Sequence, residues 1–357
     1  MADSRPGYDD VRQLTPEPAP DWWPVSPGQV TRHFKANASK GDLSRLCRSA
    51  GRRDVWLYTL GKGKPTARTA TYSAAMGSSD KRSYLGRQRP NHKQTLLILC
   101  GVHGMETVAV AGAVNLLHIL EHGKDLRGRR WPELKKMAAK VRLLLVPLAN
   151  PDGRARTGIP SLVGLTVDDL TYYGQGMWKD GKLIEWAGSK RFLPLPLDKV
   201  RFSGGYPNDD GVNFMHDVSP AGHRARETTA LLQLVEEEIV DCCLNMHGHM
   251  RGPIILPHAS HCPPAFFEHT LELADAVHAR LDAAGLRPMT VNRSVAGRGS
   301  FNLPSAMHHT SGCLSLTFET PQGVTENPCT YEELLDIQLL TIEETLRFGR
   351  ERRFRPE

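Results

Sequence analysis

The sequence predicts an α/β fold with a largely parallel central sheet, and two patterns carry this prediction. Short apolar runs alternate along the chain with longer segments of helical periodicity, which is typical of strands connected by helices. Several of these runs are apolar at nearly every position, as expected for strands that helices cover on both faces. Polar residues that follow such strands should meet at one edge of the sheet.

The elements follow one another in a regular order. The run from 54 to 60 alternates bulky and smaller residues before a Gly-Lys-Gly-Lys-Pro turn, which predicts a strand and a hairpin. Buried strands are predicted at residues 95–100, 141–148, 241–246 and 314–318. Helices are predicted at residues 107–122, 225–240, 264–284 and 331–348. Residues 154–211 are polar and glycine-rich, so we expect loops there, which commonly carry binding residues.

Composition limits the classes of partner and compartment. The formal net charge is +6, but acidic and basic residues are intermingled, so we expect no nucleic-acid partner, whereas an anionic substrate is compatible. The N-terminus does not resemble a signal peptide, and no stretch is long and apolar enough to span a bilayer. The seven cysteines include no CxxC pair and are expected to be reduced. We therefore expect a cytoplasmic protein without a membrane segment.

Two histidines and two glutamates lie where the predicted strands end. His103 and Glu106 follow the first buried run in Gly-Val-His-Gly-Met-Glu, His247 lies in Asn-Met-His-Gly-His, and Glu319 follows the last run. The two imidazoles and the Glu106 carboxylate would hold one zinc ion with an open position, as catalytic zinc requires. Glu319 would then accept a proton from water held there. These residues predict a metallohydrolase.

Simpler explanations compete for each residue. An isolated HxxE pattern is common by chance, but here it lies between a strand and a helix and contains a glycine that permits a tight bend. His249 competes with His247, because residues two apart on a strand share a face; we favour His247 as the ligand and His249 as a substrate contact. Glu319 could instead cap a turn, but its place directly after an apolar run favours proton chemistry.

Together these motifs resemble zinc carboxypeptidases of the M14 type, from about Val55 to the C-terminal helix. The matching segments, in order, are the entry hairpin at Leu60 to Pro65, the first two zinc ligands in Gly101 to Glu106, the NPDG turn at Asn150 to Gly153, the segment Arg226 to Leu231, the last ligand His247, and the general-base strand Thr317-Phe318-Glu319. The resemblance implies a three-layer α/β/α sandwich with a mixed eight-stranded sheet. We assign residues 29–357 to this single catalytic domain and the proline-rich residues 1–28 to an N-terminal extension, which Trp22 and Trp23 would attach to the domain.

The segment that grips the substrate carboxylate in that family is altered here. Where the family has Gly-Val-Asp-Leu-Asn-Arg, this chain has Gly-Val-Asn213-Phe-Met215-His216, so an imidazole replaces the arginine. An imidazole loses the bidentate geometry and much of the charge of a guanidinium. We expect Asn213, His216, Phe301 and His249 to contact the substrate, without the classical carboxypeptidase specificity.

The residue that would stabilise an oxyanion is open among four arginines. Arg154 and Arg156 follow the NPDG turn and are the nearest candidates, although they could equally be exposed loop residues. Arg201 and Arg298 could substitute from neighbouring loops.

The predicted reaction is zinc-dependent hydrolysis of an amide bond in a peptide. The altered carboxylate grip favours, as an alternative, a deacylase or amidase that acts on an N-acyl amino acid or a cell-wall peptide. A catalytically silent metal-binding module is disfavoured, because a pure binder has no need of Glu319 as a general base. The oligomeric state is left open.

Overall fold

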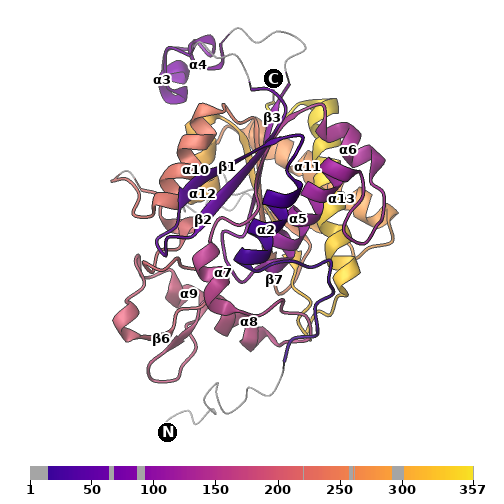
Figure 1. Cartoon of the computed structure of the whole chain (residues 1–357). Helices are drawn as coiled ribbons and strands as arrows, with labels where there is room; N and C mark the ends of the chain where they lie inside the picture. Colours follow the sequence, from indigo (N-terminus) through magenta and orange to yellow (C-terminus); the bar gives the residue numbers. More distant parts are fainter. Residues whose placement is uncertain are drawn as a thin grey trace.

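A mixed eight-stranded sheet runs through the centre of the protein in the computed structural model (Figure 1). The structure describes residues 15–63, 68–86, 93–219, 221–256, 260, 262–291 and 301–356. In spatial order the strands are β1 (Asp42–Arg48), β2 (Asp54–Leu60), β4 (Arg142–Val146), β3 (Thr95–Cys100), β7 (Cys242–His249), β10 (Leu314–Pro321), β8 (Ile254–Leu256) and β9 (Thr290–Val291). The four central strands β4, β3, β7 and β10 are parallel, whereas β1, β2 and β8 pair antiparallel with their inner neighbours. The predicted fold class is therefore confirmed.

Helices cover both faces of the sheet, and Figure 1 shows them on either side of the strands. One face packs against α2 (Pro27–Asn37), α5 (Thr107–His122), α6 (Pro132–Ala138), α11 (Pro264–Ala283) and α13 (Tyr331–Arg352). The other face packs against α10 (Arg226–Glu237) and α12 (Leu303–Ser311). Two short helices, α3 (Tyr72–Gly77) and α4 (Arg82–Leu85), lie between β2 and β3 in the chain.

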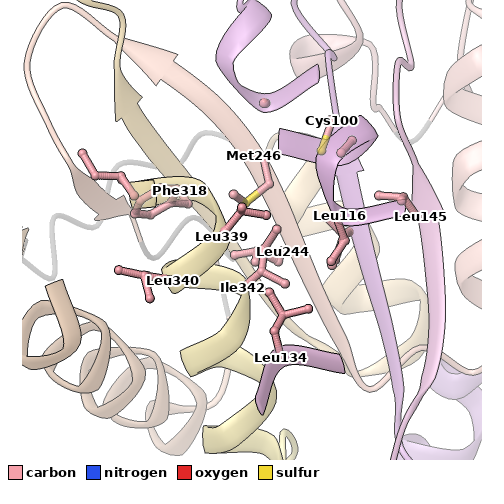
Figure 2. Packing of buried hydrophobic residues seen from close by; sticks show 14 of the residues in the cluster. Cys100, Leu116, Leu134, Leu145, Leu244, Met246, Phe318, Leu339, Leu340 and Ile342 are labelled. Atoms are coloured by element: carbon pink, nitrogen blue, oxygen red, sulfur yellow. The ribbon is translucent and has the colours of Figure 1, made fainter. Parts of the chain in front are cut away.

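The continuous apolar runs arise because alternate side chains enter two different cores. In β3, Leu96 and Ile98 belong to the core on the α13 side, whereas Leu97 and Leu99 belong to the core on the α10 side. Figure 2 shows the first core, where Leu244 of β7 lies among leucine and isoleucine side chains from α13. Each such side chain contributes about 1.5–3 kcal/mol when it leaves water.

The N-terminal segment is packed onto the domain. The Trp23 side chain is 3% exposed, and its ring meets that of Tyr331 edge-on, with centroids 5.0 Å apart. The amide of Asn115 donates to the Trp22 carbonyl at 3.1 Å. Helix α2 begins at Pro27, so the boundary assigned at residue 28 falls within a helix. Residues 1–14 lie outside the described part of the chain.

The hairpin predicted after residue 60 is wrong. Strand β2 pairs antiparallel with β1 on one side and with β4 on the other, so both of its edges are occupied. The tight connection therefore precedes β2, at residues 49–53, and does not follow it. The alternating pattern identified the strand but contained no information about its partners.

The segment after the NPDG turn contains more regular structure than the predicted loops. It includes α7 (Pro151–Thr157), α8 (Val167–Gly174), α9 (Trp186–Ser189), and the small sheet of β5 (Met177–Trp178) and β6 (Val200–Phe202). Two short 3-10 turns, at Leu197–Lys199 and Phe214–His216, complete it. Helix α8 begins at a capping box formed by Thr166 and Asp169, a local signal that the weak periodicity concealed. Figure 1 shows α7, α8, α9 and β6 gathered at one end of the molecule.

Two expectations from composition can be compared with the structure. All seven cysteines are free thiols, as predicted. Within the described ranges, no helix combines the length and the apolar character needed to cross a membrane.

Candidate active site

A tight loop after β3 brings His103 and Glu106 to the carboxyl end of the sheet. Gly101 has a φ of +63°, in the left-handed region that favours glycine. Gly104 lies so close to the turn after β4 that a Cβ on it would be 2.1 Å from the backbone nitrogen of Arg154. Only a chain without side chains at these points can turn this sharply, so the two glycines set the positions of the neighbouring histidine and glutamate.

His247 and Glu319 lie side by side on the neighbouring strands β7 and β10. The two residues are register partners in the parallel pair. Cys243 of β7 faces the core on the α10 side, and His247, four residues further on, shares that face. Strand β3 is the other neighbour of β7, so the loop that carries His103 and Glu106 arrives at the same place.

The ligand atoms of His103, Glu106 and His247 converge. Glu106 Oε1 lies 2.8 Å from His103 Nδ1, Glu106 Oε2 lies 2.9 Å from His247 Nδ1, and the two Nδ1 atoms are 3.2 Å apart. The three residues are 8%, 1% and 1% exposed. Among the residues that the structure describes, this is the one group of three histidines, cysteines or acids whose ligand atoms all lie within 4.8 Å of each other.

This arrangement fits a zinc ion. Tetrahedral ligands about 2.0–2.1 Å from zinc lie roughly 3.3 Å from one another. The separation of 3.2 Å between the two imidazole nitrogens is close to that value, and the carboxylate distances are slightly shorter. Two imidazoles and one carboxylate leave the fourth position open, as in catalytic zinc sites.

Asn213 determines which nitrogen of His103 carries the proton. Its Oδ1 accepts the backbone N–H of Met215 at 3.0 Å, which identifies that atom as the oxygen of the amide. The same Oδ1 lies 3.3 Å from His103 Nε2, so Nε2 must donate. The Nδ1 lone pair of His103 is then directed at Glu106 and His247, as a metal ligand requires. Asn213, predicted as a substrate contact, here contacts and orients His103, a candidate metal ligand.

Replacing Asn213 with alanine is expected to lower zinc affinity by about 10- to 100-fold, because His103 loses the partner that holds its ring and tautomer. Competition between the protein and a chromophoric chelator measures this affinity. Asn213→Asp is the matched control, since its carboxylate still accepts from both Met215 and His103. Equal zinc affinity in Asn213→Ala and the wild type would contradict the assigned role.

Tyr206 lies against the other side of His103 and was not identified from the sequence. The two rings stack with centroids 3.7 Å apart and planes 9° apart. Tyr206 is 9% exposed, and burial, followed by the charges of Glu106 and Glu319, raises its pKa well above the usual value. The phenol is therefore neutral and acts as a rigid wall. The two glycines before it, Gly204 and Gly205, were the only sign in the sequence that the chain at Tyr206 could come close to the His103 loop.

Burial and neighbouring charges set the protonation of the two carboxylates. Burial alone would raise the pKa of Glu106, but His103 and His247 together hold it well below the usual range. Burial is the largest cause that raises the pKa of Glu319 to about 7; His247 and Lys190 oppose this, and the charge of Glu106 adds to it. A carboxylate with a pKa near neutrality both accepts and returns a proton readily.

Arg154 and Arg156 hold backbone around the site. Arg154 is 2% exposed and donates to the carbonyls of Gly104, at 3.2 Å, and Ile159. Burial lowers its pKa to about 10. Arg156 donates to the Gly204 carbonyl at 2.5 Å and pairs with a carboxylate on the same loop. Their oxyanion role stays a prediction, as does that of Arg201, and Arg298 lies outside the described residues.

The remaining predicted substrate contacts, His249, His216 and Phe301, are not among the three converging residues. His249 Nδ1 accepts the backbone N–H of Arg251 at 3.0 Å, so His247 and not His249 joins the group. His216 is half-buried at the end of the 3-10 turn. Phe301 is 41% exposed and stacks on His309, with centroids 5.6 Å apart. Their contact with a substrate stays a prediction.

Comparison with known proteins gives a family match over part of the chain and a fold over most of it. Residues 32–183 match the model of the zinc carboxypeptidase family. A metallo-carboxypeptidase from Burkholderia cenocepacia is 16% identical, with a TM-score of 0.56 over 91% of this chain and 70% of that one. A metallo-carboxypeptidase from Pseudomonas aeruginosa, in complex with (2-guanidinoethylmercapto)succinic acid, is 16% identical, with a TM-score of 0.56 over 92% and 71%. Carboxypeptidase A from Helicoverpa armigera is 12% identical, with a TM-score of 0.52 over 91% and 70%. No curated protein matches the chain.

Because the sequence identities are low, the solved structures establish only the fold. The match of residues 32–183 to the family model links that part of the sequence to zinc carboxypeptidases. The matched region contains His103 and Glu106, and the part of the chain beyond it, which carries His247 and Glu319, completes the sheet of the same fold. The chain therefore matches the zinc carboxypeptidase family over residues 32–183 and has the fold of the metallo-carboxypeptidases.

Proposed function

We propose that this protein hydrolyses an amide bond of a peptide in a zinc-dependent reaction. The observation that carries the proposal is the convergence of three ligand atoms from His103, Glu106 and His247 beside Glu319 on the adjacent strand. When bound, zinc supplies a Lewis acid that acidifies water and polarises a carbonyl oxygen. The three residues would hold the ion, and the rest of the chemistry belongs to Glu319 and the groups around it.

Glu319 would move the proton. Its carboxylate accepts a proton from the attacking water as the new C–O bond forms, and it delivers that proton to the nitrogen as the C–N bond breaks. The pKa of about 7 suits both steps, because the group binds and releases a proton at little cost near neutral pH. Glu319 as a residue is half-buried, and access of water and substrate to its carboxylate is part of the proposal.

Fixed neighbours would keep the ligands in place during turnover. Asn213 and Tyr206 contact His103 on its edge and its face, respectively. Arg154 holds the loop through the Gly104 carbonyl. Because these contacts hold the ligand side chains in place before the substrate binds, the side chains need to move little during the reaction.

The substrate class follows from chemistry shared with relatives. The Pseudomonas aeruginosa relative is in complex with a succinic acid derivative, which supports a site that accepts carboxylate-bearing compounds. A peptide with a free C-terminus and an N-acyl amino acid both satisfy this description. The replacement of the family's arginine by His216 keeps the second class open as the alternative, which a panel of peptides and N-acyl amino acids separates.

Metal removal and restoration test the proposed function. The purified protein is expected to contain about one zinc ion per chain, and a chelator should abolish peptide hydrolysis, which added zinc should restore. Elemental analysis measures the metal, and product release from a peptide panel measures turnover. The variant His247→Ala provides the matched control, because it should not regain activity with zinc. Undiminished hydrolysis by the metal-free protein would refute the proposal.

A further inference from the structure

Helices α2 and α5 bring three histidines together. The two helices lie in contact, and Figure 1 shows them side by side. His118 and His122 are one turn apart on α5, with ring centroids 4.5 Å apart, and the ring of His33 on α2 lies 5.8 Å from that of His118. Imidazoles that share a tetrahedral metal ion, at about 2.0–2.1 Å from each nitrogen, have ring centres roughly 5 Å apart. The two observed separations lie on either side of that value.

Hydrogen bonds fix the tautomers of the two rings on α5. His118 Nδ1 lies 3.2 Å from the Lys124 carbonyl, so Nδ1 donates and Nε2 keeps the lone pair. His122 Nε2 lies 3.0 Å from Asn37 Oδ1, and Asn37 Nδ2 donates to the His33 carbonyl at 2.8 Å, which identifies Oδ1 as the acceptor. His122 therefore keeps its lone pair on Nδ1. Histidines that bind metals usually donate their other ring N–H in this way.

The third ring has a buried nitrogen without a partner. Within the described ranges, no hydrogen-bond partner reaches His33 Nε2. A buried polar atom of this kind is costly unless a water molecule or an ion satisfies it. Burial, followed by the neighbouring His118 and His122, lowers the pKa of His33 to about 4, and burial also lowers the pKa of His118. Both rings are therefore neutral at pH 7, which is the form that binds a metal.

Two helix ends make this surface favourable for a cation. Asn37 is the last residue of α2 and His122 is the last residue of α5, and their side chains are hydrogen-bonded, so the carboxyl ends of both helices meet here. Each end carries a partial negative charge from its unpaired carbonyl groups. His122 is exposed, so an ion reaches the rings directly from solvent.

We propose that His118, His122 and His33 form a second metal site, for a divalent ion of the zinc, nickel or copper class, which links α2 to α5. Imidazoles suit these ions, whereas Mg²⁺ and Ca²⁺ prefer oxygen ligands. His118 and His122 hold the ion as a chelating pair, because residues four apart are neighbours on a helix surface. This site is independent of the reaction proposed above.

Binding requires a side-chain rotation. In the part of the chain that the structure describes, only the active-site group has three ligand atoms that all lie within 4.8 Å of one another. His122 is the exposed member of the three histidines, and an exposed side chain changes rotamer within nanoseconds. Because the site is open to solvent, we expect it to hold the ion more weakly than the buried centre, so that the ion must be added.

Calorimetry with Ni²⁺ tests the site in the full-length His247→Ala protein, whose active-site ligand set is incomplete. We expect one ion per chain. Loss of a group that only orients a ligand costs about 10- to 100-fold in metal affinity, so His118→Gln and His33→Gln, which each remove a ligand, should raise the Kd by at least as much. His122→Gln repeats the test at an exposed position, where folding is not at risk. His223→Gln is the matched control, since it removes an exposed histidine that belongs to neither site.

Thermal unfolding distinguishes an ion that links two helices from loose surface binding. Ni²⁺ should raise the Tm of the His247→Ala protein and leave the Tm unchanged when His122→Gln is added. Equal Kd values with and without His118, or with and without His33, would overturn the site, as would binding that leaves the Tm unchanged. Nickel binding that depends on these histidines, in a wild-type protein that hydrolyses no peptide, would support the site while rejecting only the proposed function.

Discussion

Replacing Glu319 with glutamine is expected to leave zinc bound while lowering kcat by about 100- to 10,000-fold. Glutamine has nearly the same shape, but its amide cannot accept the proton of the attacking water. Zinc should remain, because Glu319 is not one of the three converging ligands. Steady-state kinetics on a hydrolysed peptide and elemental analysis of the same sample measure the two effects.

Controls separate proton transfer from general damage. Glu332→Gln removes an exposed carboxylate in the first turn of α13, which is not one of the converging residues, and should leave kcat unchanged. The kcat of Glu319→Asp should lie between that of the wild type and that of Glu319→Gln. The aspartate keeps a carboxylate, but its shorter side chain places that carboxylate further from the water. Wild-type turnover by Glu319→Gln would show that another group accepts the proton.

The substitution Gly104→Ala is expected to destabilise the protein by about 3 kcal/mol and to weaken zinc binding. The added Cβ would lie 2.1 Å from the backbone nitrogen of Arg154 and 2.4 Å from the carbonyl carbon of Gly153. That backbone cannot retreat, since a Cβ on Gly153 would itself lie 2.3 Å from the Gly205 carbonyl oxygen. The loop that carries His103 must then move instead. Denaturant unfolding and chelator competition measure the two changes.

Gly77→Ala provides the comparison for this prediction. A Cβ on Gly77 meets nothing within 4 Å, and the residue ends the short helix α3, where alanine is tolerated. It should change the free energy of unfolding by less than about 0.5 kcal/mol. Similar stabilities for the two variants would mean that the close packing around Gly104 is not required.

The residues of the candidate metal centre could be predicted to lie together because each follows a local pattern. His103, Glu106, His247 and Glu319 all lie at or near the ends of apolar runs, and parallel strands bring such ends together. The helices that were missed, such as α8, have short capping signals and weak periodicity. The mistaken hairpin after β2 has another cause, since a strand's own residues do not specify which strands pair with it.

The sequence alone predicted the central strands, the main helices between them and the four residues His103, Glu106, His247 and Glu319 at the strand ends, because these depend on periodicity and on residue types at strand ends. Only the tertiary structure decided which polar groups are engaged and which are free. Arg154 and Arg156 lie near the NPDG turn in sequence but hold backbone carbonyls, whereas Tyr206 reaches His103 from a segment without a clear pattern. The physical reason is that the course of an irregular segment depends on long-range packing and close backbone contacts, which no local stretch of sequence encodes.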